Sequence, residues 1–143
     1  MLTIKGLTVK FPSRFRDFSA IESVDMTIKP GEIHGLVGES GAGKSTVGAA
    51  VIGLLQAPGY VSEGILTLGD TNLRELTPAQ AHKVRGDRIS MIFQDPQTSL
   101  NPLMTIEDQL VETIQAHSAA SKTTARLRAI DLLEDIGIQN ASQ

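Results

Sequence analysis

Hydrophobic and polar residues alternate along the first part of the chain. Residues 2–9 place Leu2, Ile4, Leu7 and Val9 around Gly6, which predicts a strand with a bulge or kink at the glycine. Residues 21–28 have a partial period of two and predict a second strand, and residues 64–69 predict another between turns. The short apolar run at residues 32–37 predicts a buried strand, and residues 88–94 predict one that Pro96 ends.

The remaining hydrophobic patterns are helical. Residues 47–55 are apolar and small, and residues 79–85 follow Thr77 and Pro78, a helix start, and precede Gly86. Residues 105–117 have one apolar face and acidic residues in the first turn, and Ser121 begins a helix that ends near Gly137. Strands therefore dominate the first half, the second half is helical, and the predicted class is α/β.

A glycine-rich loop lies between the predicted strand 32–37 and the predicted helix 47–55. It consists of Gly38, Glu39, Ser40, Gly41, Ala42, Gly43, Lys44, Ser45 and Thr46. The order Gly, four free positions, Gly, Lys and a hydroxyl residue is typical of phosphate-binding loops in this context. Six specified features in the right order disfavour the alternative, a glycine-rich turn that merely joins a strand to a helix.

Each residue type in this loop has a chemical reason. The glycines let the backbone turn tightly, so that its N–H groups and the positive end of the helix dipole face one anion. Lys44 supplies a charge for the β- and γ-phosphates, Ser45 a hydroxyl for the bridging Mg²⁺, and Thr46 a hydrogen bond to the α-phosphate. The loop therefore predicts a nucleoside triphosphate site but does not specify the nucleotide.

Composition excludes several classes of protein. The 143 residues suffice for one core, and a net charge of −3 disfavours a general nucleic-acid binder. The absence of cysteine excludes disulfide scaffolds and thiolate metal sites, and the three histidines lack ligand spacing. Without a signal-peptide core or a stretch of about 20 apolar residues, we expect a soluble, cytoplasmic chain.

Two further features are candidates for the site, each with an ordinary structural alternative. Phe11, Phe15 and Phe18 precede the loop, and one of them could stack on a nucleotide base, although packing under the sheet is as good an explanation. Gln94 ends a predicted strand, where ligands bind in open α/β sheets. It could orient a water or complete a metal shell, or it could be an ordinary strand-end amide.

Three stretches of the sequence carry a resemblance to a known family: the loop 38–46, the run Met91-Ile92-Phe93-Gln94-Asp95-Pro96 and the run Thr98-Ser99-Leu100-Asn101-Pro102. Together they closely resemble the ATP-binding subunits of ABC transporters, especially the oligopeptide and dipeptide importer group. The resemblance implies an incomplete ABC-type P-loop NTPase domain, α/β, with an antiparallel N-terminal part and a helical subdomain. Residues 1–96 would be the ATP-binding core, and residues 97–143 the start of the helical subdomain.

The resemblance also assigns roles to individual residues. Residues 38–46 would be the Walker A loop that binds ATP and Mg²⁺, and Gln94 the Q-loop glutamine near the metal and the attacking water. Lys44 and Gln94 are thus the expected catalytic residues, and Ser45 and Gln94 the expected metal contacts. Phe15 would stack on adenine, with Phe18 as second candidate.

The same resemblance implies partners and a location. The expected partners are transmembrane permease subunits, a second ATP-binding subunit and, indirectly, an extracytoplasmic solute-binding protein. No nucleic-acid partner is expected. The subunit would lie on the cytoplasmic face of the membrane and energise import of a small solute, expected to be a peptide.

The chain departs from the family because it ends before a Leu-Ser-Gly-Gly signature, a Walker B strand with its catalytic glutamate, and a switch histidine. We therefore expect the N-terminal half of a subunit, not competent for hydrolysis alone and with exposed sheet edges that favour association. Binding without turnover remains an alternative, as does a soluble P-loop ATPase unrelated to transport. A GTPase would need an Asn-Lys-x-Asp sequence, and a repair ATPase a coiled coil; the chain contains neither.

Overall fold

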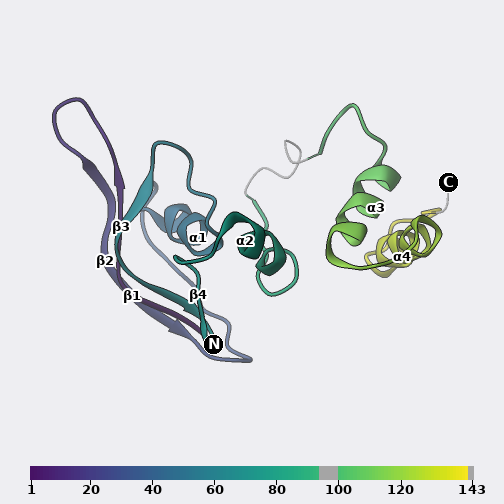
Figure 1. Ribbon diagram of the computed structural model, residues 1–143, viewed down its shortest axis with the longest axis horizontal. Helices are drawn as coiled ribbons and strands as arrows, with labels where there is room; N and C mark the ends of the chain where they lie inside the picture. Colours follow the sequence, from purple (N-terminus) through teal and green to yellow (C-terminus); the bar gives the residue numbers. More distant parts are fainter. Residues whose placement is uncertain (94–99, 142–143) are drawn as a thin grey trace. The chain divides into compact units, whose positions relative to one another are not determined.

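The computed structural model describes residues 1–93 and 100–141. The chain divides into two compact units, Met1–Met91 and Ile92–Gln143. The first unit combines an antiparallel sheet with helices α1 and α2, and the described part of the second unit contains helices α3 and α4 (Figure 1).

The sheet of the first unit has the order β2-β1-β3-β4. Its strands are β1 (Leu2–Phe11), β2 (Phe18–Ile28), β3 (Tyr60–Leu68) and β4 (Thr71–Asn72). Every neighbouring pair is antiparallel, with β1 between β2 and β3. The three strands predicted at residues 2–9, 21–28 and 64–69 are therefore confirmed, each longer than predicted.

The predicted irregularity at Gly6 is present in β1. The register of β1 shifts between Ile4 and Leu7 against β2, and Gly6 donates its backbone N–H to Oδ1 of Asp25 at 2.7 Å. In a regular strand, residues three positions apart face opposite sides of the sheet. Because of the bulge, Ile4 and Leu7 are both buried in the same core.

This core lies between the sheet and α1 (Lys44–Ile52). Its buried side chains are Ile4, Leu7, Val9, Ile21, Leu66, Val47, Ala50 and Val51. Three of them come from α1, so the helix that follows the glycine-rich loop is fixed to the sheet by apolar packing. Helix α1 begins three residues earlier and ends three residues earlier than the predicted 47–55.

Helix α2 (Pro78–Val84) begins as the sequence predicts. Thr77 and Gln80 form a capping box, in which each side chain bonds the backbone N–H of the other residue. The helix ends at Val84, and the C-cap residue Arg85 still donates its backbone N–H to Ala81 O at 3.0 Å.

The second unit contains α3 (Ile106–His117) and α4 (Lys122–Asp135), as predicted. Thr105 and Ser121 cap them, since their side chains accept the N–H groups of Asp108 and Thr124. Val111, Ala125 and Ala129 are buried between the helices. Within residues 1–93 and 100–141, no helix combines the length and apolar character needed to span a bilayer.

Two predicted strands are absent from the part of the chain that the structure describes. Residues 32–37 form no strand, and Ile33 and Val37 are 99% and 92% exposed instead of buried. Residues 88–93 contain only the isolated bridge residue Ile89, and Ile92 is 95% exposed. A strand needs a neighbour for its N–H and C=O groups, and the described strands pair with one another but not with these two runs.

Candidate functional site

The glycine-rich loop leads directly into α1. Ser40 and Gly41 form a turn, the chain bends at Ala42 and Gly43, and Gly43 is the N-cap of the helix with φ of 81°. No side chain caps this helix, and its first turn carries no acidic residue. Unpaired N–H groups and the positive end of the dipole therefore remain available to an external anion.

Gly43 lies unusually close to β2. A Cβ atom at this position would lie 2.3 Å from Cγ2 of Ile21 and 2.8 Å from the backbone oxygen of Ala20. Real Cβ atoms do not approach other atoms so closely, so only glycine fits here without a shift of the strand or the loop. The loop is thus held against β2 at the point where α1 begins.

The ammonium group of Lys44 lies over the loop. Its Nζ donates hydrogen bonds to Gly38 O at 2.9 Å and to Glu39 O at 2.6 Å. Both acceptors are uncharged carbonyls, so the positive charge has no carboxylate partner in these contacts and can attract an anion at the same place.

A pocket with a volume of about 310 Å³ opens beside the start of α1. Its described lining is Phe18, Ala20, Gly41, Gly43, Lys44, Ser45 and Thr46. Five of these seven residues belong to the predicted loop, and none is acidic. This donor set, with amides, two hydroxyls and one ammonium, fits a polyphosphate and a hydrated Mg²⁺ held through Ser45.

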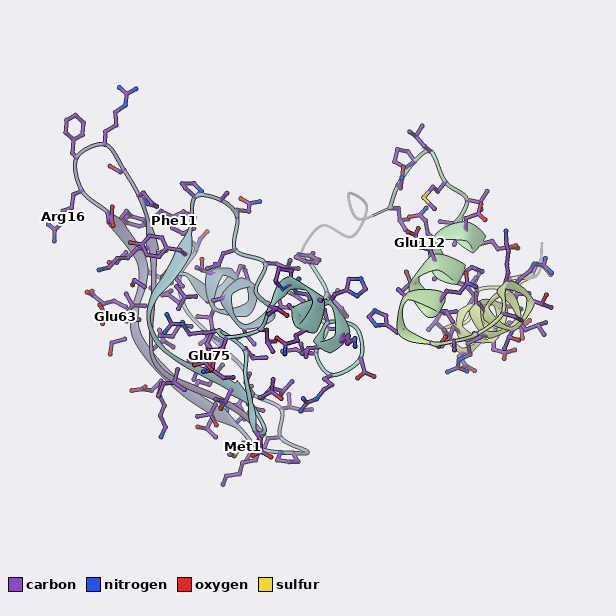
Figure 2. All side chains as sticks on the ribbon, in the orientation of Figure 1. Met1, Phe11, Arg16, Glu63, Glu75 and Glu112 are labelled. Carbon is purple, nitrogen blue, oxygen red and sulfur yellow. The ribbon has the colours of Figure 1, made fainter. Side chains whose placement is uncertain are left out.

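The aromatic candidates occupy different places. Phe18 lines the pocket and is 65% exposed, whereas Phe15 is 98% exposed in the loop between β1 and β2 and is not among the described lining residues. Figure 2 shows Arg16 on the same projecting loop. Phe11 packs against the core cluster of the sheet. Phe18 thus lies beside the loop residues of the pocket, and the predicted contact of Phe15 with adenine stays a prediction.

A hydrogen bond ties the β1–β2 loop to β3 close to Phe18. The hydroxyl of Tyr60 donates to Oδ2 of Asp17 at 3.1 Å. This hydrogen bond raises the pKa of Tyr60, and desolvation and the negative charge of Asp17 act in the same direction. The contact holds the residue that precedes Phe18 in place.

Sequence reasoning found most of the lining but missed Ala20. Ala20 lies two positions after Phe18 in β2, and in a strand such residues face the same side, so the period of two could have identified it. Gln94 lies outside the described residues, and its predicted role stays a prediction.

Comparison with known proteins agrees with this geometry. Residues 21–143 match the family model described as "ABC transporter". The chain is 39% identical over 138 residues to a dipeptide transport ATP-binding protein of Escherichia coli (strain K12), covering 96% of this chain and 42% of that protein. It is 39% identical over 144 residues to an oligopeptide transport ATP-binding protein of Bacillus subtilis (strain 168), covering 44% of the relative.

Solved structures show the same likeness. A bacterial ABC transporter cassette solved as a dimer is 28% identical, with a TM-score of 0.80 over 94% of this chain and 56% of that one. A post-hydrolysis state of an ATP-binding cassette bound to ADP and Pi has a TM-score of 0.77 at 26% identity. The chain thus spans less than half the length of the two curated relatives, with the fold of an incomplete ABC ATPase cassette, and it belongs to the ABC transporter family.

Proposed function

We propose that this chain binds ATP with Mg²⁺ through Gly38, Glu39, Ser40, Gly41, Ala42, Gly43, Lys44, Ser45 and Thr46. The observation that carries the proposal is the ammonium of Lys44, held 2.6–2.9 Å from two loop carbonyls beside a pocket with no acidic residue in its described lining. Backbone amides at the start of α1 and Lys44 would hold the phosphates, and Ser45 would reach the metal. Hydrolysis of bound ATP at its γ-phosphate would supply free energy, and Mg²⁺ would neutralise negative charge on the phosphates.

The whole subunit is proposed to couple ATP binding and hydrolysis to import of a small solute, with peptides as the expected class. The names of the curated relatives support this, since both are peptide transport ATP-binding proteins. Residues 1–96 would form the ATP-binding core, and residues 97–143 the start of a helical subdomain. Gln94 would act beside the metal and the attacking water.

The proposed assembly is peripheral to the membrane. Its partners would be permease subunits and a second ATP-binding subunit, consistent with the dimeric solved cassette. An extracytoplasmic solute-binding protein would act indirectly, and the subunit would lie on the cytoplasmic face.

The second candidate function is nucleotide binding without turnover. Hydrolysis needs a group that activates water, and no carboxylate lines the pocket among the described residues. This chain alone is therefore proposed to bind ATP but not to hydrolyse it.

A titration with MgATP tests the loop assignment. We expect Lys44→Ala to weaken binding by about 1.5–3 kcal/mol, the usual range for a hydrogen bond to a charged group. Lys29→Ala is the matched control, because Lys29 is exposed and is not part of the pocket lining. Equal affinity of the wild type and Lys44→Ala would disprove the assignment. Phosphate release by the chain alone would contradict binding without turnover.

A further inference from the structure

The C-terminal end of helix α1 receives hydrogen bonds from a residue outside the helix. Its last turn contains no basic residue to offset the negative end of the dipole. Gly53 and Leu54 return their backbone N–H groups to Ala50 O and Ala49 O at 3.1 and 2.8 Å. The carbonyls of Ile52 and Gly53, further along, need donors from elsewhere.

Arg85 supplies those donors. Its Nε donates to Ile52 O at 2.7 Å, and its Nη2 donates to Gly53 O at 2.7 Å. The planar guanidinium thus places two parallel, charge-assisted hydrogen bonds on consecutive carbonyls. One side chain completes the end of α1 and places a full positive charge beside the negative end of its dipole.

The backbone of Arg85 is itself held firmly. Its N–H closes α2 on Ala81 O at 3.0 Å, and the following turn is closed by Gly86 N–H to Ile89 O at 2.9 Å. A narrow gap beside Arg85 is lined by α1, by α2 and by the segments before and after α2, and its lining includes Val51, Leu76, Val84 and Ile89. The backbone of Arg85 is therefore held by hydrogen bonds, and its side chain contacts α1 from this ordered position.

We propose that Arg85 is a positioning residue for the nucleotide loop, an inference that rests on the ATP-binding function proposed above. Helix α1 has nine residues, which is about 13.5 Å at 1.5 Å per residue. Because the helix is short, loss of the Arg85 hydrogen bonds at its C-terminal end is expected to shift Gly43, Lys44 and Ser45 relative to β2 even while its buried residues stay packed on the sheet. Misplacement of binding groups by about 1 Å is costly in such sites.

Arg88 provides a matched control. It lies three residues further on and bonds Thr71 Oγ1 at 2.8 Å and Leu68 O at 3.3 Å, which belong to the sheet and not to α1. Arg85→Met and Arg88→Met each remove one charge and two hydrogen bonds while keeping an unbranched stem. Only the first variant should affect the loop.

The test measures amide ¹H–¹⁵N chemical shifts of Gly41 to Thr46 without nucleotide and the dissociation constant of MgATP. We expect Arg85→Met to shift these amide signals and to weaken MgATP binding about tenfold, the effect expected if the displaced loop loses one charge-assisted hydrogen bond to the phosphates. Arg88→Met should leave both unchanged, and Arg85→Lys, which keeps the cation, should recover part of the loss.

The outcomes separate the two proposals. Three results would overturn the positioning role of Arg85. The loop signals could be unchanged in Arg85→Met, the effects of Arg85→Met and Arg88→Met could be equal, or the signals could shift while the MgATP affinity stays that of the wild type. If the wild type bound no MgATP, the proposed function would fail, and the nucleotide-free spectra would still decide whether Arg85 fixes the loop.

Discussion

The close approach of Gly43 to β2 gives a prediction whose size follows from the structure. Gly41 and Gly43 both have φ of 81°, so alanine at either position should cost about 1–2 kcal/mol for the left-handed conformation. The two sites share this φ value but differ in their surroundings. A Cβ at Gly41 meets nothing within 4 Å, whereas one at Gly43 lies 2.3 Å from Cγ2 of Ile21.

The additional cost at Gly43 comes from atoms that cannot move freely. Optimal carbon–carbon contacts are about 3.5 Å or longer, so a methyl group at Gly43 must displace its neighbours by about 1.2 Å. Ile21 is 7% exposed in the core, and the Ala20 oxygen, at 2.8 Å, belongs to the backbone of β2. Overpacking of this kind costs about 1–3 kcal/mol. Gly43→Ala should therefore be less stable than Gly41→Ala by that amount.

Urea unfolding followed by tyrosine fluorescence provides the assay. Tyr60 is the single tyrosine, the chain has no tryptophan, and Tyr60 lies in β3 of the unit that contains the loop. The change in unfolded-chain entropy is the same for both glycine-to-alanine substitutions and cancels in the comparison. Equal urea midpoints for Gly41→Ala and Gly43→Ala would refute the claim that Gly43 packs closely against β2.

Two further predictions concern the sheet and its loop. The side chain of Leu66 is 1% exposed, so Leu66→Ala should lower the free energy of unfolding, measured in urea, by about 2–5 kcal/mol. Ile65 is 52% exposed, so Ile65→Ala should lower it far less. Similar losses of stability in the two variants would contradict the assignment of Leu66 to the core face of β3. Asp17→Ala should lower the pKa of Tyr60, measured by tyrosinate absorbance. Because the folded-state pKa is raised, this contact stabilises the fold below the unfolded pKa of about 10 and is lost as the pH rises through the folded value; an unchanged titration midpoint would show that the contact does not form.

Much of the site was predictable because its determinants are local. A phosphate loop is specified by residues adjacent in sequence, so the pattern from Gly38 to Thr46 was enough to predict its position and a following helix, although the helix begins at Lys44 and not after Thr46. Caps at Thr77 and Ser121 were predictable for the same reason, since each bonds a residue three positions away.

Long-range contacts were not predictable in this way. The hydrogen bond between Asp17 and Tyr60, next to Phe18, joins residues that are 43 positions apart. The same holds for Arg85, whose partners on α1 precede it by 32 and 33 residues. No local pattern encodes such pairs.

The sequence by itself determined the family, the loop and the periodicity of β1 with its bulge at Gly6, because these depend on short-range spacing and residue type. Only the tertiary structure decided which apolar runs become strands. Residues 32–37 include Ile33, Leu36 and Val37, yet they form no strand, since a strand exists only where a neighbour satisfies its backbone hydrogen bonds.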